Sequence, residues 1–223
     1  MTEFVFMLTQ NDVTVPHALE VLEQVRGTGL RHVGCKDIGL SPDEYVELFS
    51  RMKRYGMATF MEVVSSDEKK HFDGVNLALR LDVDYLVGGM PQHTRKTLEY
   101  LKRSGTRTKY CPYVGEVTGH PCILRGSVDE IIDSGREAES LGAYGMNLLL
   151  YRYAGDQKAL LNSVFEELRL PLIVAGNVRT FEQIEELRAR NAWAFTIGGA
   201  IFEKRFVKEG SIQDQISAVM NRL

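Results

Sequence analysis

The stretch from residue 171 to residue 202, PLIVAGNVRTFEQIEELRARNAWAFTIGGAIF, carries the most information about the fold of this chain. It contains an apolar segment, LIVAG, that ends in Gly176-Asn177, then an amphipathic helical segment, and then a second apolar segment, AFTIG, that ends in Gly198-Gly199. Two apolar strands joined by an amphipathic helix are typical of a parallel strand–helix–strand unit. The sequence therefore predicts that these two strands belong to one parallel sheet.

Glycine follows or ends both predicted strands, so bare main-chain N–H groups would meet at one corner of the sheet. A short helical turn that begins near Gly199 would add the partial positive charge of a helix N-terminus. Such a corner favours an anion of the size of a phosphate. The sequence therefore predicts a phosphate-binding site at Gly176, Asn177, Gly198 and Gly199.

The same alternation of strand and helix runs along the whole chain. Six further strands are expected at 4–8, 32–36, 58–64, 84–89, 109–115 and 144–151, each followed by an amphipathic segment. Strict alternation indicates parallel strands joined by right-handed crossovers. Eight such units in 223 residues predict an α/β fold, a single (β/α)8 TIM barrel over residues 1–223, with the phosphate site after strands 7 and 8. An open doubly wound sheet is the alternative, but no G-x-G-x-x-G follows the first strand.

Composition and charge exclude several classes of protein. The net charge of −3 leaves no excess of basic residues to displace counterions, which argues against broad nucleic-acid binding by electrostatics but leaves a local basic patch open. No apolar run approaches the roughly 20 residues of a membrane span, and the N-terminal residues turn polar too early for a signal peptide. The expected location is the cytoplasm, where Cys35, Cys111 and Cys122 would stay reduced.

Lys36 is the first candidate for a catalytic residue. The active face of such a barrel lies at the C-terminal ends of the strands, and Lys36 ends the second one. If it points inward, its ammonium lies among Glu62, Asp12 and Asn147, where it could polarise a carbonyl, hold an enolate or form a Schiff base. A structural ion pair with Asp37 or Glu62 is the alternative.

Glu62 and Asn147 are the other two candidates, because each places a polar group inside an apolar strand. A buried carboxylate must be paired, hydrogen-bonded or neutralised by a raised pKa, and a raised pKa suits a general acid or base. Glu62 is equally compatible with a structural role beside Lys36. Asn147 could bind substrate hydroxyls or satisfy main-chain groups of the inner layer.

Other polar residues have weaker claims. Arg152 follows the sixth strand and could add charge to a phosphate or pair with Asp156, and His120 lies in the long loop after the fifth strand. His71 and His93 fall at helical positions expected to face solvent. No cluster has metal-ligand spacing, so neither a metal nor another cofactor is expected.

The segments 175–178 (AGNV) and 196–202 (TIGGAIF) resemble the phosphate-binding barrels of the ribulose-phosphate-binding superfamily. This resemblance implies a TIM barrel with a phosphomonoester clamp at Gly176, Asn177, Gly198 and Gly199. The specific motif covers the last quarter of the chain and selects no individual member. Asn177 stands where the family often has a second glycine. Dimers are common among such barrels, so a homodimer is compatible with the resemblance.

The opening segment, from FMLTQND to SPDEYVELF, is similar in layout to glycerol-3-phosphate-responsive antiterminators, which are barrels of the same superfamily that sense a phosphate and bind RNA. That resemblance implies a regulatory phosphate site without turnover.

Two functions are therefore expected from the sequence. The first is an enzyme that acts on a small phosphorylated sugar-like substrate, of isomerase, epimerase or carbon–carbon lyase type, with Lys36 as charge stabiliser and Glu62 as acid/base. The alternative is a non-enzymatic, RNA-linked barrel that senses a phosphorylated metabolite. A nicotinamide-dependent dehydrogenase is a third class, without a dinucleotide fingerprint to support it.

Overall fold

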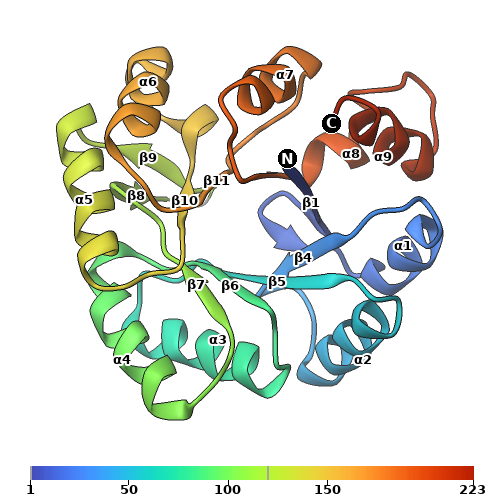
Figure 1. Cartoon of the computed structure of the whole chain (residues 1–223). Coiled ribbons are helices and arrows are strands. Elements are labelled where there is room, and N and C mark those ends of the chain that lie inside the picture. Colours follow the sequence, from blue (N-terminus) through green and yellow to red (C-terminus); the bar gives the residue numbers. More distant parts are fainter. Residues whose placement is uncertain (1, 120) are drawn as a thin grey trace.

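Eight apolar segments form the eight parallel strands of a barrel in the computed structural model, which describes residues 2–119 and 121–223 (Figure 1). The strands are β1 (Glu3–Met7), β4 (His32–Lys36), β5 (Ala58–Val63), β6 (Tyr85–Gly88), β7 (Lys109–Cys111), β10 (Met146–Leu148), β11 (Leu172–Val174) and β12 (Ala194–Ile197). Helices alternate with these strands around the outside. The α/β fold of (β/α)8 type expected from the alternation is thus confirmed.

The strands follow one another around the barrel in the order β10-β11-β12-β1-β4-β5-β6-β7. The ring closes between β7 and β10 through a bridge that pairs Tyr113 with Asn147, and through a bond from the Asn147 N–H to the Pro112 carbonyl (2.8 Å). Because all strands run in parallel, their C-terminal ends form one common mouth.

The helices begin at capping residues that were recognisable in the sequence. Ser41 and Ser127 each accept a hydrogen bond from the third helical N–H, and Glu44 and Glu130 bond back to the cap, which completes two capping boxes. The helices are α1 (Ala18–Val25), α2 (Pro42–Arg54), α3 (Glu68–Arg80), α4 (Thr94–Ser104), α5 (Val128–Ser140), α6 (Gln157–Glu167), α7 (Phe181–Ala189), α8 (Gly199–Phe202) and α9 (Ile212–Met220), with 3-10 turns η1 (Pro91–His93) and η2 (Leu150–Arg152). In the described ranges, none of these helices has the length and apolar character needed to cross a bilayer.

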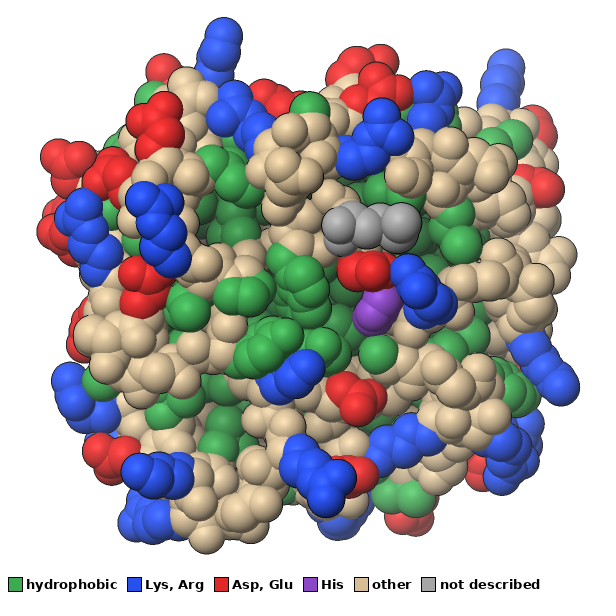
Figure 2. All heavy atoms as spheres, viewed as in Figure 1, with side chains coloured by type: hydrophobic (Ala, Val, Ile, Leu, Met, Phe, Trp, Pro, Cys, Tyr) green, Lys and Arg blue, Asp and Glu red, His purple; other side chains and the backbone are tan. Residues whose placement is uncertain are grey.

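Side chains fill the barrel, so it is a packed core and not a pore. An inner cluster is formed by alternate strand residues, among them Val5, Phe60, Val87 and Ile173, all at most 1% exposed. Figure 2 shows hydrophobic side chains gathered over the centre of the barrel, with charged side chains mainly around them. The residues of the opposite strand face pack against the surrounding helices in a second, larger cluster.

Two hairpins over the barrel mouth were not expected. One, β2 (Thr9–Gln10) with β3 (Val13–Thr14), follows the first strand, and the other, β8 (Glu116–Thr118) with β9 (Ile123–Arg125), lies in the long loop after the fifth. The sixth strand is also shorter than expected, because the chain turns into η2 at Leu150.

The prediction that His71 and His93 face solvent was wrong. Both are buried, at 0% and 5% exposure, and their rings lie 4.8 Å apart at the packing of α3 against η1 and α4. His71 Nε2 is 2.7 Å from Thr97 Oγ1, and burial lowers the pKa of His71 to about 4. A neutral histidine with a hydroxyl partner can be buried at such a contact, which helical periodicity alone did not reveal.

Candidate functional site

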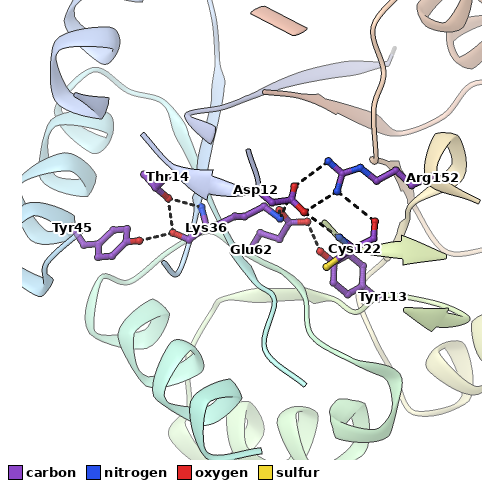
Figure 3. A network of polar contacts seen from close by, with 8 residues as sticks. All are labelled: Asp12, Thr14, Lys36, Tyr45, Glu62, Tyr113, Cys122 and Arg152. Atoms are coloured by element: carbon purple, nitrogen blue, oxygen red, sulfur yellow. Dashed lines mark hydrogen bonds and ion pairs between the residues drawn. The ribbon is translucent and has the colours of Figure 1, made fainter. Parts of the chain in front are cut away.

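Lys36 and Glu62 form the centre of a buried polar network at the barrel mouth (Figure 3). They are register partners on the adjacent strands β4 and β5, so their side chains leave the sheet on the same face. Lys36 Nζ lies 3.2 Å from Glu62 Oε2, and the two residues are only 5% and 7% exposed. The ion pair between Lys36 and Glu62 considered from the sequence is therefore present.

The end of β4 is held firmly around Lys36. The Lys36 carbonyl accepts hydrogen bonds from Thr14 Oγ1 (2.8 Å) and from the Tyr45 hydroxyl (2.7 Å), and the Lys36 N–H donates to Thr14 Oγ1 (3.0 Å). Thr14 comes from the first hairpin and Tyr45 from α2. These bonds fix where the lysine side chain begins its path into the mouth.

Tyr113 is a member of the site to which sequence reasoning assigned no role. Tyr113 is the second residue after β7, and its hydroxyl donates to Glu62 Oε1 at 2.6 Å. Burial, followed by the nearby carboxylate, raises the pKa of Tyr113 well above its usual value, so it serves as a neutral donor. The sequence signal that could have identified Tyr113 as a site residue is its position within two residues of the end of a barrel strand.

Asp12 joins the two hairpins across the mouth. It accepts two hydrogen bonds from Arg152, at 2.8 Å and 3.0 Å, and one from the main-chain N–H of Cys122, at 3.1 Å. It also lies 3.5 Å from Lys36 Nζ. Burial by itself would raise the pKa of Asp12, but the bonds from Arg152 and the charge of Lys36 outweigh it and lower the pKa to about 2.

Arg152 therefore neither pairs with Asp156 nor points free toward a ligand. Its guanidinium is engaged bidentately by Asp12 and bonds in addition to the Cys122 carbonyl at 3.4 Å. Asp12 reaches this position from a tight turn in which Asn11 and Asp12 both have positive φ, 51° and 62°, a conformation that short polar side chains tolerate.

Gly176, Asn177, Gly198 and Gly199 lie together at one corner of the mouth, where they line the same cavity. Gly176 and Asn177 have φ of 81° and 83°, which turns the chain sharply after β11. In the described part of the chain, no protein acceptor takes a bond from the main-chain N–H of Gly176, Asn177 or Gly198. Gly199 is the first residue of α8. A side chain at Gly198 would collide with Thr9, so packing also requires glycine there.

A carboxylate stands beside this corner. Glu203 lines the cavity and accepts hydrogen bonds from Arg179 (3.1 Å) and Arg205 (2.9 Å). The two guanidinium groups compensate its charge, and all three side chains are partly exposed.

One cavity of about 200 Å³ connects the glycine corner with Lys36, Glu62 and Tyr113. Asn147 is the one candidate that does not line it. Asn147 is register partner to Ile173 of the inner cluster and is fully buried, and its Oδ1 and Nδ2 have no hydrogen-bond partner among the described residues.

The electrostatics of the site favour a protonated lysine. Burial alone would lower the pKa of Lys36, but the carboxylates of Glu62 and Asp12 outweigh burial and raise it. An ammonium can stabilise negative charge on a neighbouring oxygen, whereas attack on a carbonyl to form an imine requires the neutral amine. The arrangement thus suits charge stabilisation.

Among the described residues, no group of three or more His, Cys, Asp or Glu side chains is arranged to hold a metal ion. The sequence candidate His120 lies outside the described residues.

Comparison with known proteins finds similar folds but no similar sequence. No family model and no curated protein matches the chain. The barrel is similar to the N-acetylmannosamine-6-phosphate 2-epimerase from Clostridium perfringens, with 12% identity and a TM-score of 0.63 over 89% of this chain and 86% of that one. It is also similar to the YdjI aldolase from Escherichia coli K12 (10% identity, TM-score 0.65, 99% and 88% covered) and to the native KDPGal structure (14%, 0.62, 99% and 93%). At these identities, the likenesses establish the barrel fold.

Proposed function

We propose that this protein is an enzyme that acts on a small phosphorylated, sugar-like carbonyl compound, as an isomerase, an epimerase or a carbon–carbon lyase. The observation that carries the proposal is the single cavity shared by the glycine corner and the buried Lys36–Glu62 pair. The main-chain N–H groups of Gly176, Asn177 and Gly198, which have no protein acceptor in the described part of the chain, suit a phosphate at one end. A carboxylate and an ammonium suit proton transfer next to a carbonyl at the other.

In the proposed reaction, Glu62 removes a proton from the carbon next to the carbonyl, and the C–H electrons move onto the carbonyl oxygen. The Lys36 ammonium stabilises the resulting enolate. An epimerase then returns a proton to the opposite face of the same carbon. In an isomerase, Glu62 returns the proton to the former carbonyl carbon while the proton of the adjacent hydroxyl moves to the enolate oxygen. A lyase would form the same enolate by breaking a carbon–carbon bond, with Glu62 taking the hydroxyl proton of the departing carbonyl fragment. Tyr113 would orient Glu62 through its 2.6 Å hydrogen bond.

The structural likenesses support this class of reaction. One similar barrel is an epimerase of a phosphorylated amino sugar, and another is an aldolase. Both reaction types can proceed through an enolate. A purely regulatory barrel would need the phosphate corner but would have no use for a buried base and ammonium within the same cavity.

A matched pair of variants tests the phosphate site. Gly199 does not have positive φ, and a Cβ there would make an ordinary contact with Glu203 Oε1 at 3.6 Å, so a side chain fits. Gly199→Asp places a negative charge at the corner, and Gly199→Asn is its neutral control of equal shape. Calorimetric titration with inorganic phosphate should show at least about a ten-fold weaker affinity for the Asp variant than for the Asn variant. Equal affinities of the two variants for inorganic phosphate would show that phosphate does not bind at this corner.

Isotope exchange tests the catalytic roles. Ligands are first selected by a thermal scan of phosphorylated compounds, because a ligand at about 100 times its Kd stabilises the folded protein by about 2.7 kcal/mol. The compounds that raise the melting temperature are then incubated with the protein in deuterated water. Wild type should exchange the proton next to the carbonyl, and Glu62→Gln and Lys36→Met should reduce the exchange by about 100-fold or more while phosphate affinity is retained. Binding without exchange or turnover in wild type would favour the metabolite-sensing alternative.

A further inference from the structure

The size of the cavity at the proposed active site limits the length of its ligand. Its volume of about 200 Å³ is below the range of about 300–1,000 Å³ that is usual for drug-sized ligands. The cavity therefore favours a ligand that is smaller than a drug-sized molecule. A triose phosphate suits such a volume better than a hexose phosphate, which carries three more carbon atoms with their hydroxyl groups.

The two hairpins keep the cavity from lengthening. Asp12 of the first hairpin is tied to Arg152 by a bidentate pair at 2.8 Å and 3.0 Å, and to Cys122 of the second hairpin at 3.1 Å. The end of the second hairpin is also anchored to the segment after η2, since Tyr153 donates to the carbonyl of Gly126, the residue after β9, at 2.9 Å. A longer ligand would have to break a charge pair in which Asp12 is only 7% exposed.

The charges that line the cavity limit the ligand to one anionic group. Lys36 is paired with Glu62 and Asp12, and Arg152 is paired with Asp12. At the other end of the cavity, Arg179 is paired with Glu203. Among the described residues, each Lys or Arg that lines the cavity thus already has a carboxylate partner, and the glycine corner offers main-chain donors for a single phosphate. A second phosphate or a carboxylate on the ligand would lie beside carboxylates, and the described lining residues offer no free cation to compensate it.

We propose that the substrate is a triose- or tetrose-sized phosphate monoester that carries a carbonyl group and no second anionic group. This inference rests on the proposed function, since it places the phosphate at the glycine corner and the carbonyl at Lys36 and Glu62. The glycine corner holds the phosphate, and the cross-linked hairpins exclude longer sugars.

Calorimetric titration of the whole protein with a short ligand series tests the proposal. The series is inorganic phosphate, dihydroxyacetone phosphate, an aldotetrose phosphate, a hexose phosphate and 3-phosphoglycerate, which has a carboxylate on a triose-length chain. The triose or tetrose compound should bind at least about ten-fold more tightly than the hexose phosphate and the phosphoglycerate. A hexose phosphate or phosphoglycerate that binds equally well would overturn the size or the charge limit while leaving the proposed function intact. Failure of every compound, inorganic phosphate included, would overturn both.

A cavity-enlarging variant tests whether the hairpin wall sets the length. Cys122 is 1% exposed and lines the cavity, so Cys122→Ala removes a sulfur atom from its wall. Cys35→Ala, which removes a sulfur atom from a fully buried site outside the cavity, is the matched control. The affinity ratio of the longer to the triose phosphate should rise by about three-fold or more in Cys122→Ala and stay constant in Cys35→Ala. An unchanged ratio in Cys122→Ala would show that this wall does not select length.

Discussion

Replacement of Lys36 by methionine should destabilise the protein strongly, because it leaves the buried Glu62 carboxylate without its cation, whereas Asp12 keeps Arg152. Lys36 Nζ is 3.2 Å from Glu62 and 3.5 Å from Asp12, and at an effective dielectric constant of about 20 each contact corresponds to about 5 kcal/mol of gross attraction. The cost of removing the ammonium from water offsets much of this attraction. Loss of one partner from a buried pair typically costs about 3–5 kcal/mol, which is the loss we expect in urea denaturation.

A double-mutant cycle separates the ion pair from simple packing. Glu62→Gln removes the charge that faces Lys36, so Lys36→Met with Glu62→Gln should lose less stability than the sum of the single variants. The expected coupling energy is on the order of 2 kcal/mol. The exposed pair of Lys53 and Asp82 is the control, since its 2.9 Å contact is shorter but its side chains are 37% and 83% exposed. Lys53→Met with Asp82→Asn should show a coupling below about 1 kcal/mol.

The destabilisation caused by Lys36→Met should also depend on pH. In the folded variant, an uncompensated buried carboxylate binds a proton at a pH where the unfolded chain has already released it. Stability of the variant relative to wild type should therefore fall as pH rises from about 5 to 8. A coupling no larger than that of the surface pair, together with a destabilisation that is constant with pH, would refute the assigned role of Lys36 as a charge partner.

Three further variants test other buried or charged groups. Burial raises the pKa of Asp37 to about 7, above the roughly 3.9 of the unfolded chain, so wild type loses stability as pH rises through this interval. Asp37→Asn should therefore exceed wild type in unfolding free energy by about 4 kcal/mol at pH 8 and match it near pH 4 in urea titrations, and an equal difference at both pH values would contradict this cause. Asn147→Leu should raise the unfolding free energy by about 1–2 kcal/mol, since the Asn147 amide is buried without a partner among the described residues; lower stability would show that the amide is satisfied. Glu203→Gln should tighten calorimetric binding of inorganic phosphate by roughly two- to five-fold, and weaker binding would show that its hold on Arg179 matters more than its charge.

Local patterns were enough to predict the barrel. Apolar runs, amphipathic segments and caps such as Ser41 and Ser127 are short-range features, and eight strand–helix units leave a closed parallel sheet as the economical way to bury every strand. The strand-end rule likewise identified Lys36 and Glu62 as residues of the mouth. Lys36 and Glu62 contact each other because they are register partners on β4 and β5. The order of the units along the chain predicts that these two strands are neighbours.

Contacts between distant segments could not be predicted in this way. Asp12 and Arg152 are 140 positions apart, and the hairpins that bring them together show no clear apolar alternation. The same holds for the buried positions of His71 and His93, which depend on how α3 packs against its neighbour.

The sequence by itself thus determined the barrel, the face on which polar residues gather and the glycine turns after the last two strands, because periodicity and backbone freedom are local properties. Only the tertiary structure decided which charges neutralise one another, how small the cavity is and that Asn147 lies outside it, because these depend on side chains that meet across the barrel.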